Sequence, residues 1–239
     1  MSLRTDPSPK PPDYLKGKIP SVAALTTALE STVVHQPVGT LYCRAAWGQE
    51  YLLPHALTKA HRFGPPRALR VPNGALPFGW LYLAHDMATA IWESQFAKSD
   101  AMAAGGFFLD PVAVERGVLG RFTLTRELAL WDLSGEACSK LGIFDTISSR
   151  DHEACHWIGY NLRQAMLQCE AKRMPDGFLY PSRRMRGRLA MAIRSDLLDE
   201  LRQGAVLESQ PFKDSSEYAL LQSDSLRADV PDPTVSFGE

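Results

Sequence analysis

The stretch Gly79-Trp-Leu-Tyr-Leu-Ala-His-Asp-Met-Ala-Thr-Ala-Ile-Trp-Glu93 joins a strand pattern to a helix pattern. Its first half, Trp80–Ala84, is rich in aromatic and aliphatic residues and predicts a short buried strand. Asp86 then stands where a helix N-cap belongs, and the composition of Met87–Ala97 favours a helix. Glu93 closes the apolar run of this helix and has no basic residue four positions further on. A glutamate near a helix end is most often exposed, so a functional interpretation of Glu93 needs support from other residues.

The 239 residues have an ordinary globular composition, with 45% hydrophobic and 22% charged residues. A formal net charge of -1 gives no indication of a nucleic acid or an acidic membrane as a direct partner. Four cysteines without a CxxC pair favour reduced thiols. The sequence has neither a secretory signal pattern nor an apolar segment long enough to span a bilayer. We therefore expect a cytoplasmic protein that is not associated with a membrane.

Strand and helix patterns are interspersed without a regular βαβ rhythm, which predicts an α+β fold. We expect a Pro-rich arm and helix over residues 1–38, one domain over 39–210, and a polar tail over 211–239. Ser21 can cap the first helix, which is expected to run from Val22 to about Val34 and to pack on the core or form an oligomer contact. Other strands are expected over 39–46, 117–125, 128–133, 178–181 and 189–193, and other helices over 134–142, 151–172 and 195–204.

The segment His152-Glu153-Ala-Cys-His156 matches the HExxH pattern of zinc peptidases on a predicted helix. Two imidazoles four residues apart can bind Zn²⁺, with the glutamate as the base. The charged neighbours Arg150 and Asp151 and the position at the helix start disfavour this interpretation, and no third-ligand motif follows. We expect a helix surface with one half-buried histidine and no metal, and we keep a zinc peptidase as an alternative.

Two further residues stand in unusual settings. Arg44 ends the apolar strand segment Leu41-Tyr-Cys-Arg44, where a guanidinium is costly unless it has an anionic partner. That partner is either a core carboxylate or a phosphate or carboxylate of a ligand. Ser182 follows the buried strand of Gly177-Phe-Leu-Tyr-Pro-Ser-Arg-Arg184, either as a local cap of a basic turn or as part of a site.

Taken in chain order, these segments resemble the RES-domain family from about Gly39 to about Leu207. The family's Arg, Glu and Ser are matched by Arg44, Glu93 and Ser182. The resemblance is carried by Leu-Tyr-Cys-Arg44, Arg62-Phe-Gly-Pro, Leu-Tyr82-Leu-Ala, Ala-Ile-Trp-Glu93, Trp131-Asp-Leu-Ser-Gly and Asp176-Gly-Phe-Leu-Tyr-Pro-Ser182. The chain departs from the family pattern at Arg70-Val-Pro-Asn73-Gly, so loop contacts that the family makes there are not transferred.

The resemblance implies a fold similar to ADP-ribosyltransferases and a toxin that degrades NAD⁺. Such toxins cleave the bond between nicotinamide and ribose, by hydrolysis or by phosphorolysis with inorganic phosphate. NAD⁺ is then a substrate, and no resident cofactor is expected. The implied partner is an antitoxin with a helix-turn-helix domain that blocks the active site, so nucleic acid is contacted only through that antitoxin. A homo-oligomer is compatible with this arrangement.

The matched residue types suit this chemistry. Cleavage of an N-glycosidic bond builds positive charge on the ribose, which the carboxylate of Glu93 can stabilise. A pyrophosphate needs bidentate cations, which suits Arg44 and the more loosely matched Arg62. An aromatic ring such as Tyr82 can stack on nicotinamide. Ser182 can donate to a ribose hydroxyl or a phosphate, with Arg183 beside it, and no histidine is placed to make it a nucleophile.

We therefore expect Arg44, Glu93 and Ser182 to be catalytic and Arg62, Tyr82 and Arg183 to bind substrate. One alternative is a transferase that places ADP-ribose on a macromolecule. Another is a non-catalytic member that binds a partner through the pocket.

Overall fold

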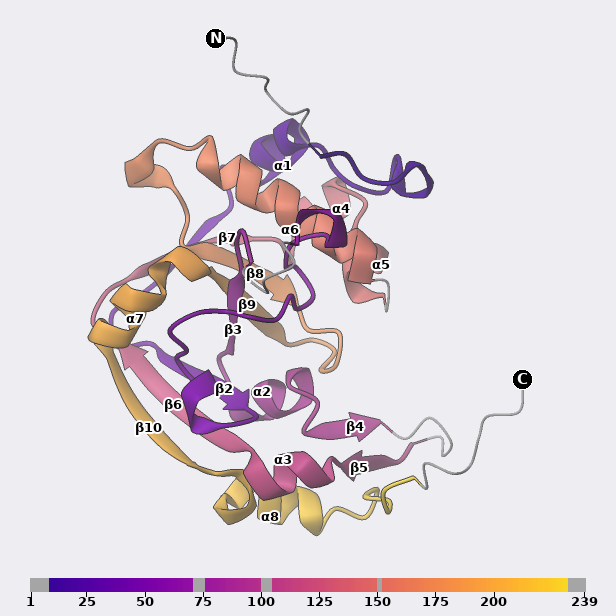
Figure 1. Ribbon diagram of the computed structural model, residues 1–239, viewed down its shortest axis with the longest axis vertical. Coiled ribbons are helices and arrows are strands. Elements are labelled where there is room, and N and C mark those ends of the chain that lie inside the picture. Colours follow the sequence, from indigo (N-terminus) through magenta and orange to yellow (C-terminus); the bar gives the residue numbers. More distant parts are fainter. Residues whose placement is uncertain (1–8, 71–75, 100–104, 150–151, 232–239) are drawn as a thin grey trace.

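A computed structural model describes residues 9–70, 76–99, 105–149 and 152–231. Its centre is an eight-stranded sheet with the order β1-β7-β8-β9-β3-β2-β6-β10 (Figure 1). Neighbouring strands in this sheet are antiparallel except for β7 and β8, which are parallel. The strands are β1 (Val33–Gln36), β2 (Leu41–Ala46), β3 (Trp80–Ala84), β6 (Val118–Leu124), β7 (Leu128–Asp132), β8 (Gly177–Pro181), β9 (Leu189–Arg194) and β10 (Ala205–Pro211).

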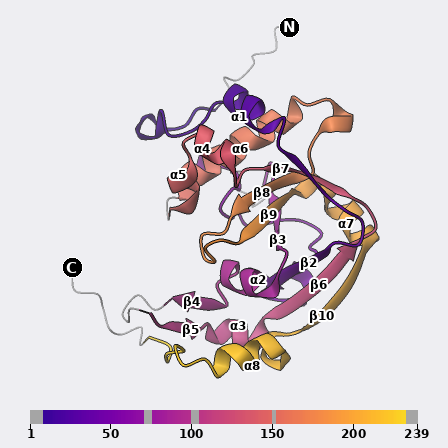
Figure 2. The same ribbon diagram turned by 180° about the vertical axis from the view of Figure 1, so that it is seen from behind.

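Separate groups of helices cover the two halves of the sheet (Figures 1 and 2). Helices α1, α4, α5 and α6 lie over the half that contains β7, β8 and β9. Helices α2, α3 and α8 lie at the other half, beside the small sheet of β4 and β5. The chain is therefore an α+β protein, as predicted. The helices are α1 (Val22–Leu29), α2 (Met87–Glu93), α3 (Pro111–Arg116), α4 (Glu136–Lys140), α5 (Phe144–Ser148), α6 (His152–Leu167), α7 (Leu198–Gly204) and α8 (Ser216–Gln222), and the small sheet joins β4 (Ala97–Ser99) to β5 (Phe107–Leu109).

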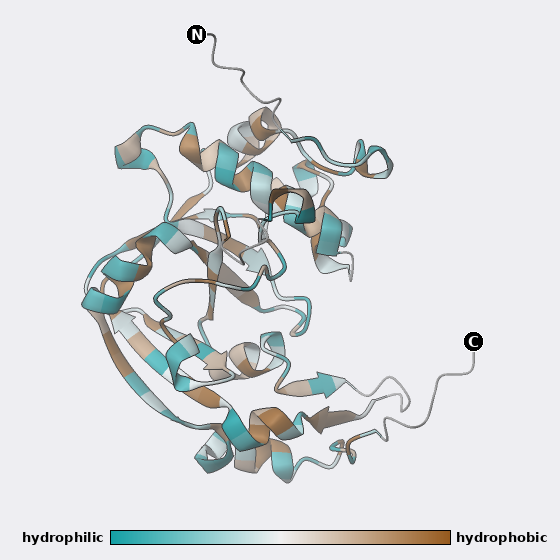
Figure 3. Cartoon of the chain, in the orientation of Figure 1, coloured by the Kyte–Doolittle hydropathy of each residue, from teal (hydrophilic) through white to brown (hydrophobic). Residues whose placement is uncertain are grey.

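Each half has its own hydrophobic cluster. The first is built around Trp80, Trp131 and Phe178 under α1 and α6, and the second around Phe96 and Phe212. Helix α6 shows alternating hydrophilic and hydrophobic bands in Figure 3, as expected for a helix with one face on the core. Burial of these apolar side chains is the main stabilising contribution to both halves.

The two halves of the sheet meet at a weak junction. Strands β2 and β3 share the single register pair Cys43–Ala84, whereas β2 shares six pairs with β6 and β3 shares five with β9. Beyond that pair, the side chain of Arg44 takes the place of a ladder contact and donates from Nη1 to the carbonyl of Tyr82 at 2.6 Å. The sheet therefore splits between β3 and β2, and this split makes room for a pocket.

The opening stretch folds as predicted at its start and differs at its end. Strand β3 covers the predicted residues, and the Asp86 carboxylate caps α2 by accepting from the Thr89 amide at 2.8 Å. The expected helix over residues 87–97 is too long, because α2 ends at Glu93. Gln95 adopts a positive φ of 64°, and the Phe96 amide donates back to the Ile91 carbonyl at 3.1 Å. This Schellman-type end buries Phe96 and turns the chain into β4 immediately after Glu93.

The N-terminal helix prediction is also too long. Ser21 caps α1 as expected, but α1 ends at Leu29, and Val33–Gln36 forms the edge strand β1 against β7. Helix α1 packs on the core through Leu25 and Leu29. The expected helix over 151–172 ends at Leu167, and residue 151 lies outside the described residues.

Short 3₁₀ turns complete the chain, and two of them lie in the segments expected as arm and tail. In the first, Leu15 is fully buried against the cluster of Ala154 and Trp157. In the second, Phe212 is fully buried and leads into α8. The turns are η1 (Asp13–Leu15), η2 (Gln49–Tyr51), η3 (Arg67–Leu69), η4 (Ala171–Arg173), η5 (Ser195–Leu197) and η6 (Phe212–Asp214).

Candidate active site

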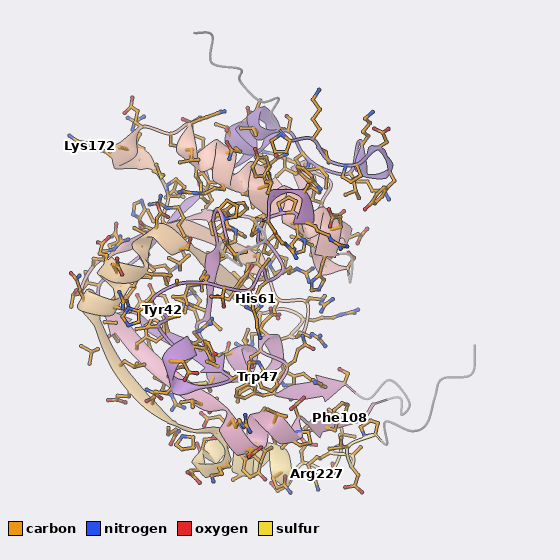
Figure 4. All side chains as sticks on the ribbon, viewed as in Figure 1. Tyr42, Trp47, His61, Phe108, Lys172 and Arg227 are labelled. Atoms are coloured by element: carbon orange, nitrogen blue, oxygen red, sulfur yellow. The ribbon has the colours of Figure 1, made fainter. Side chains whose placement is uncertain are left out.

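A pocket of about 500 Å³ lies at the split between β2 and β3. This volume falls within the usual range for small-molecule sites. Strands β2, β3 and β8, the end of α2 and the irregular segment 54–62 all contribute to its lining. Figure 4 shows two lining residues, His61 and Trp47, on opposite sides of the opening between the two halves. The pocket thus brings together residues that lie far apart in the sequence.

Glu93 lines this pocket and is half-buried rather than exposed. Its Oε1 accepts a hydrogen bond from Ser182 Oγ at 2.6 Å, and its Oε2 accepts one from the Tyr180 hydroxyl at 3.4 Å. The Arg184 amide donates to Oε1 at 3.4 Å. Among the residues that the structure describes, no Lys, Arg or His forms an ion pair with Glu93. Neutral donors therefore fix the position of this carboxylate and leave its charge uncompensated.

Ser182 is buried at the start of the loop between β8 and β9. Its Oγ accepts from the amides of Arg184 and Met185 at 3.2 and 2.9 Å while it donates to Glu93. The two predicted interpretations of Ser182 are therefore combined, because the hydroxyl that caps the turn also orients the carboxylate. Ser182 is absent from the lining of the pocket and acts on it through Glu93.

Arg44 reaches the pocket from strand β2, which lies in the other half of the sheet from the strands β8 and β9 that flank Ser182. Its Nε donates to the carbonyl of Tyr51 at 3.0 Å and its Nη1 to the carbonyl of Tyr82 at 2.6 Å. Burial lowers the pKa of Arg44 to about 10, so the guanidinium is still cationic at neutral pH. Within the described part of the chain, no carboxylate is paired with this cation. The core ion pair considered for Arg44 is thus not formed among the described residues.

Tyr82 and Arg62 also line the pocket. The Tyr82 hydroxyl accepts from the Phe63 amide at 2.9 Å, and burial raises the pKa of Tyr82 well above its ordinary value. Arg62 donates from Nη2 to the carbonyl of Ser149 at 3.2 Å, and its buried Nε has no hydrogen-bond partner among the described residues. Arg183 donates to the same carbonyl at 3.2 Å. The two predicted substrate-binding arginines therefore converge on the end of α5.

The described lining of the pocket is rich in cationic side chains. Its described lining includes six Lys or Arg side chains and a single carboxylate, Glu93. Lys98 is partly neutralised by Asp110, whose Oδ2 lies 2.5 Å from Nζ. Such a lining attracts an anionic ligand. The six cationic residues are Arg44, Lys59, Arg62, Lys98, Arg183 and Arg184.

The family model for the RES domain matches residues 35–220. The chain belongs to the RES-domain family. At the level of the family, this membership supports a toxin-like role related to NAD. No curated protein matches the chain significantly, and neither does any solved structure. In the described parts of this RES domain, no helix is long and apolar enough to cross a membrane.

Sequence reasoning missed Tyr180, whose hydroxyl contacts the Glu93 carboxylate of the RES domain. Burial and the nearby carboxylate raise the pKa of Tyr180 well above its ordinary value, so it is a neutral donor. Side chains two residues apart on a strand share a face, and Tyr180 stands two residues before Ser182. This spacing in the sequence could have identified Tyr180 as a residue of the same site as Ser182. Trp47, Tyr51 and His61 were also missed, because only the folded chain brings the irregular segments after β2 to the pocket.

The contacts of the HExxH segment of the RES domain disfavour a zinc site. His156 is buried, and the Arg70 guanidinium approaches its ring nitrogens at 3.3 and 3.4 Å. Glu153 accepts from the indole of Trp157 at 3.1 Å. The described residues contain no group of three His, Cys, Asp or Glu side chains that could hold a metal ion. A cation beside one of the two histidines disfavours a zinc peptidase.

Asn73, named in the departure from the family pattern, lies outside the described residues.

Proposed function

We propose that this RES domain consumes NAD⁺ by cleaving the N-glycosidic bond between nicotinamide and ribose. The single observation that carries the proposal is a carboxylate, Glu93, fixed by neutral donors in an otherwise cationic pocket. The cationic lining suits the pyrophosphate of a dinucleotide, and the carboxylate suits the positive charge that develops on the ribose. Family membership supports the same kind of substrate.

In the proposed reaction, the bond between ribose C1′ and the nicotinamide nitrogen breaks, and its electron pair leaves with neutral nicotinamide. The cation on the ribose ring is stabilised by Glu93. A water molecule or a phosphate then forms a bond to C1′, and water loses a proton in that step. The products are nicotinamide and either ADP-ribose or ADP-ribose that carries a phosphate on the same ribose carbon.

The other residues have supporting roles in the proposal. Arg44 holds the pyrophosphate with the guanidinium hydrogens that the Tyr51 and Tyr82 carbonyls leave unused. Arg62 and Arg183 supply further positive charge at the α5 end of the pocket, where an acceptor phosphate would also be attracted. Tyr82 offers an aromatic surface to nicotinamide. Ser182 and Tyr180 hold Glu93 in place, which makes them positioning residues.

The direct test is to incubate the purified protein with NAD⁺, with and without phosphate, and to measure nicotinamide and the ribosyl product by chromatography. We expect nicotinamide release in at least one condition, and the ribosyl product then identifies the acceptor. Absence of release by the wild-type chain contradicts the proposal. Labelled ADP-ribose retained on a macromolecule would favour a transferase, and NAD⁺ binding without loss would favour a non-catalytic member.

We further propose that the chain works in the cytoplasm with a helix-turn-helix antitoxin that closes this pocket, as the likeness to the family implies. Its fold is proposed to be similar to ADP-ribosyltransferases. The antitoxin proposal predicts that the product of a neighbouring gene co-purifies with the chain and prevents NAD⁺ loss. A neighbouring helix-turn-helix protein that binds neither the chain nor its pocket would contradict it.

A further inference from the structure

Two large aromatic side chains on the pocket rim have no role in the proposed chemistry. Trp47 is 39% exposed and Tyr51 is 49% exposed, and both line the pocket. Exposed aromatic rings beside a pocket are a common feature of ligand sites, because removing their apolar surface from water by stacking a planar ligand group on them is favourable.

Arg44 links the backbone of Tyr51 to the rest of the pocket. Its guanidinium is held between two carbonyls, that of Tyr82 on β3 and that of Tyr51 in η2. The guanidinium therefore lies between Tyr82 on β3 and Tyr51 in η2. A ligand whose pyrophosphate lies on Arg44 extends in both directions from it.

The Trp47 ring is held in place from behind. It packs edge to face on Phe96, with centroids 5.3 Å apart and an angle of 76° between the rings. Phe96 is itself fully buried at the end of α2. The packing on Phe96 therefore restricts the orientation of the Trp47 ring. Figure 4 shows Trp47 in the half opposite His61.

We propose that Trp47 and Tyr51 bind the purine base of the substrate, on the other side of Arg44 from Tyr82. This inference rests on the proposed function, because it places the adenine of NAD⁺. A purine stacks on aromatic rings with little dependence on hydrogen bonds, and loss of one such ring weakens binding by about 10- to 100-fold. The cleaved end of the substrate does not contact Trp47 or Tyr51.

The test compares NAD⁺ with nicotinamide mononucleotide, which has the same scissile bond but no adenosine. In Trp47→Ala, kcat/KM for NAD⁺ is expected to fall about 10- to 100-fold, mainly through KM, while kcat/KM for the mononucleotide stays within about twofold. Trp47→Phe retains a ring and is expected to recover most of the loss. Tyr51→Ala is expected to act in the same direction, and Tyr14→Ala, which removes an exposed tyrosine outside the pocket, is the matched control.

Inhibition by AMP gives a second measurement that does not depend on cleavage of the mononucleotide. AMP is expected to inhibit NAD⁺ cleavage by the wild type, and Trp47→Ala is expected to weaken that inhibition by about tenfold or more. Equal losses on both substrates, or an unchanged AMP inhibition constant, overturn the purine site even if NAD⁺ is cleaved. If the wild type cleaves no NAD⁺, the proposed function fails, and the purine site fails with it.

Discussion

The carboxylate of Glu93 at the end of α2 and the guanidinium of Arg44 on β2 line the same pocket, and neutral groups hold both of them. Glu93 is fixed by two hydroxyls and one amide, and Arg44 by two carbonyls. In a buried ion pair, the two charges would neutralise each other and would not be available to a ligand. The separate neutral partners instead leave a negative and a positive charge available to one substrate.

The proposed reaction gives the two charges different tasks. Positive charge develops only as the glycosidic bond breaks, so Glu93 is expected to act mainly in the transition state. The pyrophosphate is charged throughout the proposed reaction, so Arg44 is expected to act mainly in binding. Changes at Glu93 should therefore lower kcat, and changes at Arg44 should raise KM.

The largest expected effect is that of Glu93→Gln. This variant keeps the shape and hydrogen-bonding oxygen of the side chain and removes its charge, so kcat for NAD⁺ should fall about 10²- to 10³-fold. KM should change only a few-fold. Steady-state nicotinamide release measures both constants, and a thermal melt checks the fold. Glu115→Gln makes the same change at an exposed residue of α3 and should leave both constants unchanged. Unaltered kcat in Glu93→Gln would remove Glu93 from the chemistry.

The next effect is that of Arg44→Lys. Lysine keeps the charge but loses the planar fork that reaches two carbonyls and a phosphate together. KM for NAD⁺ should rise about 10- to 100-fold, with a smaller change in kcat. The exposed Arg116→Lys is the matched control. A fall in kcat with KM unchanged would contradict the assignment of Arg44 to binding.

Ser182→Ala should have an intermediate effect on both activity and stability. The variant removes the donor to Glu93 and the acceptor for two backbone amides, so the free energy of unfolding should fall by about 1–2 kcal/mol. The less firmly held carboxylate should lower kcat about tenfold. Ser182→Thr, which restores the hydroxyl, should recover part of the loss. Chemical denaturation and nicotinamide release measure the two effects, and Ser223→Ala at the end of α8 is the control. Full activity in Ser182→Ala would show that Glu93 is held without this hydroxyl.

The smallest effect concerns the turn that ends α2 at Glu93. Gln95 has a positive φ of 64°, a conformation that glycine adopts without steric cost. Gln95→Gly should raise the free energy of unfolding by about 0.5–1 kcal/mol. In contrast, Gln203→Gly in the last turn of α7 should lower it by a similar amount. Urea denaturation compares the two variants, and destabilisation by Gln95→Gly would show that the turn depends on the glutamine side chain.

The local parts of the site could be predicted from the sequence. Strand β3 and the cap of α2 at Asp86 follow from apolar pattern and capping rules. The end of α2 could not be predicted, because it depends on the burial of Phe96 against residues far along the chain. For the same reason, the first helix was expected to run to about Val34, inside the edge strand Val33–Gln36, since the pairing of this strand with β7 is not visible locally.

The partners of the site residues were less predictable than their identities. Arg44 stands out in its strand, but nothing in the sequence indicates that the carbonyls of Tyr51 and Tyr82 hold it. Those contacts exist only because the sheet splits between β2 and β3. Ser182 was recognised as a turn residue or a site residue, and the tertiary structure is needed to see that it is both.

The most direct test of this division of tasks is a single-turnover measurement with enzyme in excess and NAD⁺ fully bound. At saturation, nicotinamide release by Arg44→Lys should approach the wild-type rate, while release by Glu93→Gln should stay about 10²- to 10³-fold slower. The opposite order, with Glu93→Gln at the wild-type rate and Arg44→Lys slow, would contradict the central claim that Glu93 stabilises the transition state and Arg44 binds the substrate.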